Sequence, residues 1–201
     1  MRTKLCGVAL VCVGALALAQ EAPAPAARYG VPLSAEAYPQ GNPKEALSSA
    51  LRAIEKDRVE YLAAHLLDPK LIDGRVEERA KQMEDAVEKE LRLVRDEQLR
   101  QGVSRRERLP SDAGDFAAVV HDQARARAFK LVVRDVRGHL AESPETVKEF
   151  RRYLRDGTVI DAGEAATVTL KDAKETQVNL RRVGVRWHLD DRKGPELLEK
   201  K

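Results

Sequence analysis

The chain has 201 residues, of which 34% are charged and 4% are aromatic, and its formal net charge at neutral pH is +3. This length suits one folded domain. Basic and acidic residues nearly balance, so the sequence offers no basic surface of the kind that nucleic acid binding requires, and we exclude a nucleic-acid-binding protein.

Residues 1–19 have the three parts of a secretory signal peptide. A basic start at Arg2 and Lys4 precedes an apolar run, which ends in the small-x-small sequence Ala-Leu-Ala. We expect cleavage after Ala19 and export to the periplasm or the medium, with no membrane span after cleavage. An uncleaved signal anchor is the alternative, although the run is shorter than a typical membrane-spanning helix.

Removal of the signal peptide changes the cysteine content and the net charge of the chain. Both cysteines, Cys6 and Cys12, lie inside the signal, so the mature chain offers no disulfide, thiolate nucleophile or zinc–thiolate site. Without Arg2 and Lys4 the chain has 34 basic and 33 acidic residues, a formal net charge of +1. The local arginine pairs are then expected to be solvated surface.

Residues 20–42 are rich in residues that prevent a regular helix or a central strand. They include Pro23, Pro25, Pro32 and Pro39, with Gly30 and Gly41. We interpret this stretch as a tether that leads into a single α+β domain formed by residues 43–201.

The domain is expected to open with a helix that Asn42 caps and Pro43 begins. Its apolar face is interrupted by the sequence Glu-Lys-Asp-Arg and resumes before Asp68-Pro69 stops the helix. One bent helix and two short helices both fit this pattern. The apolar positions are Leu47, Leu51, Ile54, Leu62, Leu66 and Leu67.

Two long charged segments follow, each with a narrow apolar stripe at helical spacing. The first ends at Gly102, and its predicted buried positions are Ile72, Val76, Met83, Val87, Leu91 and Val94. We interpret Met83 as core filling. The second helix is predicted from about Asp112 to His139, with Gly138 near its end, and a further helix starts at Ser143-Pro144 and closes at Asp156-Gly157.

The C-terminal part alternates apolar and polar residues with a period of two, which indicates strands with one buried face. The segments are AATVTLK, TQVNL and VRWHLD, with TVID as an additional strand before them. We predict an antiparallel meander covered by the amphipathic helices, with turns at KDAKE and Gly184. Trp187 should be buried, with Val185 and Leu189 on the same face.

The Pro-led opening PKEALSSALRAIEKDRVEYLAAHLLD and the ending GEAATVTLKDAKETQVNLRRVGVRWHLDD resemble the nuclear transport factor 2-like superfamily. Gly184, Trp187 and Leu189 match its final strand. The resemblance implies a cone-shaped α+β domain. The superfamily includes ketosteroid isomerase and polyketide cyclases, whose chemistry requires a carboxylate and a hydrogen-bond donor that converge on an apolar pocket.

The sequence assigns no catalytic, cofactor-binding or metal-binding residue. No motif places Asp57, Tyr61 or Asp161 in an acid–base role. The histidines are far apart in sequence: His65, His121, His139 and His188. His188 and Asp190 share one face of the last predicted strand, but two ligands are fewer than a metal ion normally requires.

The functional prediction is therefore a non-catalytic exported domain that binds a protein or a small apolar ligand, or that serves as a scaffold. The alternative is a cavity-based isomerase or cyclase-like enzyme of the same fold. Self-association of the charged segments Asp73–Gln101 and Asp112–His139 is a third hypothesis, because a narrow apolar stripe also suits pairing between copies.

Overall fold

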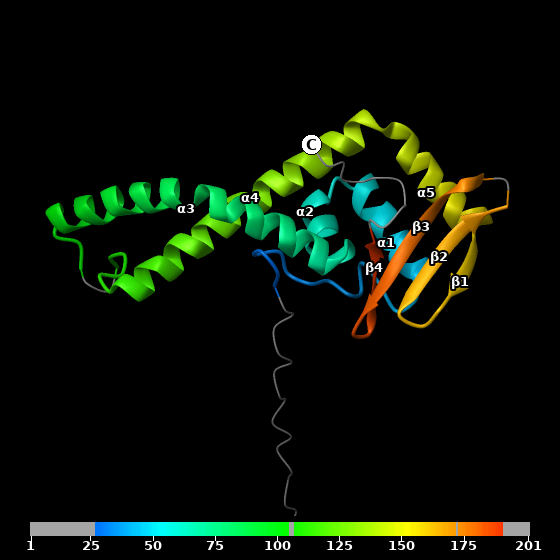
Figure 1. The fold of residues 1–201 in the computed structure, drawn as a ribbon, viewed down its shortest axis with the longest axis horizontal. Helices are drawn as coiled ribbons and strands as arrows, with labels where there is room; N and C mark the ends of the chain where they lie inside the picture. Colours follow the sequence, from blue (N-terminus) through cyan, green and yellow to red (C-terminus); the bar gives the residue numbers. More distant parts are fainter. Residues whose placement is uncertain (1–26, 105–106, 172, 191–201) are drawn as a thin grey trace, which may run out of the picture.

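The computed structural model describes residues 27–104, 107–171 and 173–190, which form an α+β fold (Figure 1). Helices precede a four-stranded antiparallel sheet, as predicted. The helical elements are α1 Pro43–Glu55, α2 Val59–Tyr61, the π-helical turn η1 Leu62–Leu66, α3 Pro69–Arg100, α4 Ala113–Glu142 and α5 Pro144–Asp156. The strands are β1 Thr158–Asp161, β2 Ala165–Leu170, β3 Ala173–Val183 and β4 Arg186–Asp190.

The first predicted helix divides into two segments. Asn42 caps α1 as expected, since its Oδ1 accepts a hydrogen bond of 2.9 Å from the backbone N–H of Glu45. The helix ends at Glu55, and Asp57 then adopts a left-handed backbone conformation with φ of 51°. The helical path restarts at Val59, so the alternative with two short helical segments is correct.

Helices α3 and α4 pack mainly against each other and form a long antiparallel hairpin (Figure 1). The buried residues of α4 recur every four positions for most of its length: Phe116, Val120, Ala124, Ala128, Val132 and Val136. Rows with this spacing run obliquely to a helix axis, so helices that pack along them cross rather than run side by side. The fully buried Ala80, Ala124 and Ala128 allow close approach in the middle of the hairpin.

Two predictions about these helices are wrong in detail. Val94, expected in the buried stripe, is 42% exposed, because the crossing separates the ends of the two helices. Gly138, expected near the end of the second helix, lies inside α4, which continues to Glu142. Met83 is partly buried against the core, in agreement with its predicted packing role.

The sheet is covered by α1 and α5, whereas the long hairpin contributes little to its cover. The junction from α5 to β1 requires Gly157, because a Cβ there would lie 2.2 Å from the backbone oxygen of Tyr153 and 2.6 Å from Cγ1 of Val168. The core beneath the sheet includes the fully buried Phe150, Tyr153 and Leu180. Ser143 precedes α5 as predicted, but its side chain makes no capping hydrogen bond.

The strands follow the predicted meander in the order β1-β2-β3-β4. Trp187 and Leu189 are buried, with exposed fractions of 3% and 4%, but Val185 is 77% exposed. Val183 pairs with Arg186, and Gly184 has φ of 61°, so Val185 lies in the turn and not in the ladder. The turn predicted over KDAKE is shorter, since β3 already begins at Ala173.

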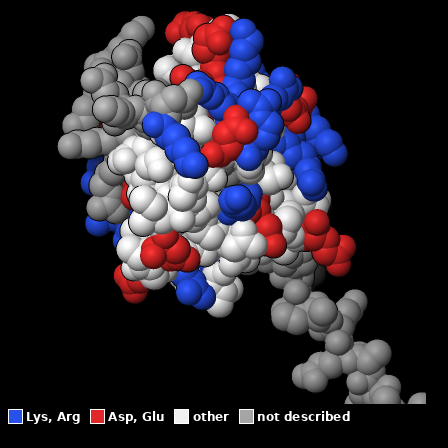
Figure 2. Space-filling view, turned by 90° about the vertical axis from the view of Figure 1, so that its right-hand side faces the viewer, with Lys and Arg blue, Asp and Glu red and all other residues white. Residues whose placement is uncertain are grey.

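The other face of the sheet is open over β1 and β2. Thr158, Ile160, Thr167 and Thr169 share this face, and Ile160 is 59% exposed. The side of the molecule that holds the sheet shows a broad uncharged area, with most of the charged side chains around it (Figure 2). In the part of the chain that the structure describes, no helix is both long and apolar enough to cross a membrane.

Candidate functional site

The segment that precedes α1 is docked on the domain. We name residues 28–42 the strap. Tyr38 and Gln40 within it have exposed fractions of 8% and 5%, and Ser49 donates a 2.7 Å hydrogen bond to the carbonyl of Pro39. The tether predicted for residues 20–42 therefore does not describe the part from residue 28 onward, while residues 1–26 lie outside the described residues.

A tight turn fixes the start of the strap. Arg28 and Val31 exchange two backbone hydrogen bonds of 3.0 Å, and Tyr29 and Gly30 between them have φ of 54° and 79°. The guanidinium of Arg28 donates to the carbonyls of Ala64 and Pro69 and to the carboxylate of Asp73. These bonds join the turn to the middle of the π-helical turn and to the start of α3.

Tyr29 extends the attachment to the hairpin. Its ring stacks on that of Phe129 with centroids 4.4 Å apart, and its hydroxyl donates to Asp73. Burial, followed by the hydrogen bond to the Asp73 carboxylate, raises the pKa of Tyr29 to about 12. The phenol is therefore a neutral donor at physiological pH.

Tyr61 at the end of α2 and His65 in the π-helical turn η1 face the strap. The Tyr61 ring stacks on Tyr38 with centroids 4.3 Å apart, and its hydroxyl lies 3.2 Å from both the backbone N and O of Ser34. Nε2 of His65 donates to the carbonyl of Val31 at 2.8 Å. Burial raises the pKa of Tyr61 and lowers that of His65. Both side chains thus hold the strap in their neutral forms.

Gln40 joins the strap to the outer edge of β4. Its side-chain amide donates to the carbonyl of His65 at 2.9 Å and to that of Trp187 at 2.7 Å. The backbone carbonyl of Gln40 accepts a 2.9 Å hydrogen bond from the backbone N–H of Trp187. On the same strand, Leu189 forms a parallel β-bridge with Leu67. These contacts cover an edge that would otherwise present unpaired backbone groups.

His188, expected on the open face of β4, is buried, with an exposed fraction of 2%. Burial and the nearby Arg186 guanidinium lower the pKa of His188 to about 4, and its Nδ1 has no hydrogen-bond partner among the described residues. Asp68 lies near, but it accepts hydrogen bonds from the backbone of Lys70 and from Arg181. His188 is a neutral imidazole in the core rather than an accessible metal ligand.

The three side chains considered for acid–base chemistry occupy separate environments. Asp57 is exposed and pairs with Arg137 of α4 at 3.2 Å. Asp161 is exposed and accepts from the backbone N–H of Gly163 in the turn after β1. Tyr61 is buried under the strap. In the described part of the chain, no group of three or more histidine, aspartate, glutamate or cysteine side chains could hold a metal ion.

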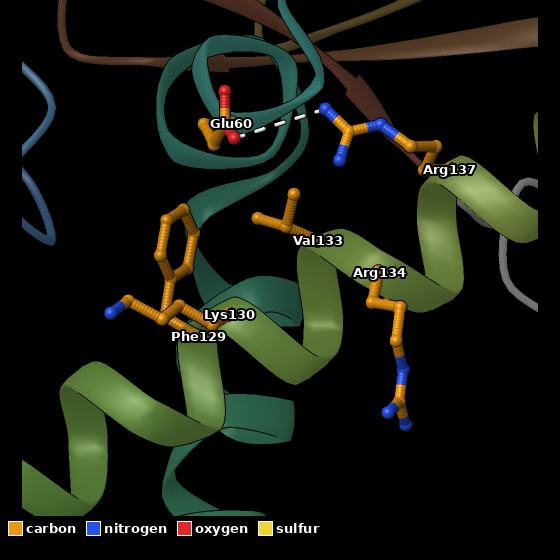
Figure 3. Close-up of a pocket in the computed structure, with 6 residues that line it drawn as sticks. All are labelled: Glu60, Phe129, Lys130, Val133, Arg134 and Arg137. Carbon is orange, nitrogen blue, oxygen red and sulfur yellow. Dashed lines mark ion pairs between the residues drawn. The ribbon is translucent and has the colours of Figure 1, made fainter.

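A first concave surface lies between α2 and α4 (Figure 3). It encloses about 210 Å³, and Phe129 and Val133 form its apolar wall. Arg137 pairs with Glu60 across it at 3.8 Å, while the side chains of Lys130 and Arg134 point away from it. The basic residues at this hollow therefore do not converge on a common anion site.

A second, larger concave surface lies on the distal half of the hairpin, and we name it the hairpin groove. It encloses about 520 Å³ between the diverging ends of α3 and α4. The α4 wall contributes the apolar residues Ala113, Phe116, Ala117 and Val120, of which Ala113 and Ala117 are exposed. A concave surface between two helices that combines exposed alanines with charged side chains suits the binding of another protein segment.

The α3 wall of the hairpin groove is charged in two blocks. Glu84, Asp85 and Glu88 come first along the helix, and Arg92 and Arg95 follow. The Arg95 guanidinium lies over the Phe116 ring at 4.6 Å, and Glu88 pairs with Arg92. The sequence did not predict this groove, because its apolar stripes were expected to pack on the sheet or to pair between copies of the chain, and not to pack α3 against α4. The signal that could have indicated it is the four-residue spacing in α4.

Polar side-chain contacts join the two helices along both sides of the hairpin. On one side, Nδ1 of His121 lies 2.8 Å from Glu84. On the other, Arg127 forms a bidentate contact with Glu90, and its hydrogen bonds lower the pKa of that carboxyl. His121 and Glu84 thus serve the hairpin, whereas His65 and His188 lie in the body of the domain. The structure does not bring the four histidines together.

Comparison of the chain with protein-family models, with curated proteins and with solved structures finds no match.

Proposed function

We propose that the protein is a non-catalytic, exported binding or scaffold domain, and that the α3–α4 hairpin carries its recognition surface. The observation that supports this proposal most strongly is the hairpin groove. The groove lies on helices that extend away from the sheet, and its exposed alanines border apolar side chains of the hairpin seam. The burial of these side chains against a partner contributes favourably to the free energy of binding, because it removes apolar surface from water.

The export part of the proposal rests on the N-terminal sequence. Intact-mass measurement of the protein from its native envelope should give a chain that begins at Gln20. A chain that still carries residues 1–19 would contradict cleavage and would support the alternative of an uncleaved signal anchor.

Recognition through the groove can be tested by site-specific photo-crosslinking in the native envelope. A photoreactive residue at Ala117, exposed in the groove, should give an adduct of discrete mass. The matched control is Ala126, which is exposed on the same helix but does not line the groove. Equal crosslinking at both positions, or none at either, would contradict a binding surface in the groove.

The nuclear transport factor 2-like resemblance and the enzyme alternative both remain hypotheses. The enzyme alternative predicts turnover of small carbonyl or ester substrates that Asp57→Asn, Tyr61→Phe or Asp161→Asn abolishes in a folded protein. The separate environments of these three residues favour the binding proposal instead. Turnover lost in one of these variants would establish the enzyme.

A further inference from the structure

Four of the five charged residues on the α3 wall of the hairpin groove follow a self-complementary order, and the fifth, Glu84, contacts His121 of α4. Asp85 and Glu88 lie before Arg92 and Arg95 on one side of the helix, with spacings of three, four and seven residues. If a second α3 packs antiparallel about a two-fold axis level with position 90, Asp85 faces Arg95 of the copy and Glu88 faces Arg92. Each contact then occurs twice, as in every isologous interface.

We propose that the hairpin groove is the interface of a homodimer, in which the distal halves of two hairpins pack antiparallel. This inference rests on the proposed recognition role of the hairpin and names a second copy of the chain as the partner. The complementary blocks specify the register and the antiparallel orientation, because a parallel arrangement places like charges together.

The apolar residues in the groove and one leucine beyond it supply the contact area. Leu99 does not line the groove, but it lies four residues after Arg95 and seven after Arg92, so it continues the same face of α3, and it is 51% exposed. Ala113 and Ala117 on α4 have small side chains, which leave room for the α3 helix of the copy beside Phe116. Dimer formation removes Leu99 and these alanines from water.

The four charged residues are accessible to a second copy, and their existing contacts are a Glu88–Arg92 pair on the same helix and the packing of Arg95 over the Phe116 ring. Asp85 is exposed, and the internal Glu88–Arg92 pair lies on the helix surface, with side-chain exposures of 39% and 60%. Exposed pairs of this kind contribute little to stability, so their exchange for contacts between copies carries a small free-energy cost. The pairs in the dimer are partly desolvated and are correspondingly stronger.

The test is sedimentation equilibrium of the purified mature protein with two charge-reversed variants. We expect the wild-type protein to form a reversible dimer with a Kd of about 1–100 µM, in the range of transient interfaces. Asp85→Lys/Glu88→Lys and Arg92→Glu/Arg95→Glu should each weaken the dimer at least about tenfold, because like charges then face each other. An equimolar mixture of the two variants should restore it as a heterodimer.

The matched control for the Asp85/Glu88 variant is Glu97→Lys/Asp122→Lys, which makes the same change in net charge at exposed positions that do not line the groove. This variant should dimerise like the wild type. A wild-type protein that stays monomeric up to about 1 mM overturns the proposal, as does a dimer that the control weakens as much as the groove variants do. Specific crosslinking of Ala117 to a different protein would overturn the homodimer while supporting the recognition role of the groove.

Discussion

The body of the domain and the distal half of the hairpin are built differently. In the body, a strap, a π-helical turn and a sheet edge that are far apart in sequence meet around buried polar groups, as the contacts of Gln40 with His65 and Trp187 show. In the distal hairpin, two helices that are consecutive in the chain contact each other, and charged residues cover most of their surface. The body thus depends on specific buried contacts, whereas the hairpin leaves surface available for a partner.

The largest difference between the two regions is expected for truncation of an apolar side chain. Trp187→Ala should lower the free energy of unfolding by about 3–5 kcal/mol, because Trp187 is 3% exposed and its removal leaves a cavity. Leu93→Ala on the hairpin should change it by less than about 0.5 kcal/mol, because Leu93 is 70% exposed. Urea denaturation measures both, and similar losses would remove the distinction between the regions.

The pH dependence of stability should also come from the body. His188 has a pKa lowered from 6.5 to about 4, so the unfolded chain binds more protons than the folded protein between these values. The contribution of His188 to the free energy of unfolding is therefore fully present above pH 6.5 and is lost as the pH decreases towards 4. This residue alone accounts for a decrease of about 3 kcal/mol. His188→Gln should flatten this part of the curve, while the control His139→Gln, at the end of α4, should leave it unchanged.

The attachment of the strap can be tested at Gln40. Gln40→Ala leaves the buried carbonyls of His65 and Trp187 without this donor and should cost about 2–3 kcal/mol. The exposed Gln82 on α3 is a matched control, and Gln82→Ala should have almost no effect. Limited proteolysis with N-terminal sequencing should show faster cleavage within the strap of the Gln40 variant. Equal protection in both variants would show that Gln40 does not hold the strap.

Alanine substitutions at two glycines should distinguish a closely packed backbone position from an exposed position on a helix. Gly157→Ala should destabilise the protein by about 1–3 kcal/mol, because the new Cβ would clash with the backbone of Tyr153 and with Val168. Gly138→Ala should instead stabilise it by about 0.5–1 kcal/mol, because Gly138 is exposed inside α4 and a Cβ there meets nothing within 4 Å. Thermal denaturation should show shifts of opposite sign.

The smallest effect is expected for an ion pair between the hairpin helices. Arg79 and Asp135 pair at 2.5 Å, and both side chains are partly exposed, with fractions of 32% and 41%. A double-mutant cycle with Arg79→Ala and Asp135→Ala should give a coupling of about 0.2–1 kcal/mol that decreases in high salt. A coupling of several kcal/mol, insensitive to salt, would mean that such pairs are a main source of hairpin stability.

The sequence by itself predicts most local elements. Asn42 and Pro43 identify the start of α1, and the alternation around Val168, Leu180 and Trp187 identifies the sheet, because capping chemistry and side-chain periodicity are local properties. Glycine is an ambiguous local signal. Gly157 ends a helix as expected, but Gly138 lies within one, and the partly buried Leu140 after it still packs against the core.

Only the tertiary structure decides what those elements contact. The proline-rich segment before α1 offers no periodic pattern, yet Tyr38 and Gln40 anchor it, because their partners lie on α2, η1 and β4. His188 is on the polar side of β4 by alternation but is buried by neighbouring segments that the pattern of one strand does not specify. The apolar stripes of α3 and α4 indicate buried faces without indicating the partner, and the four-residue spacing that makes them cross also opens the groove between their ends.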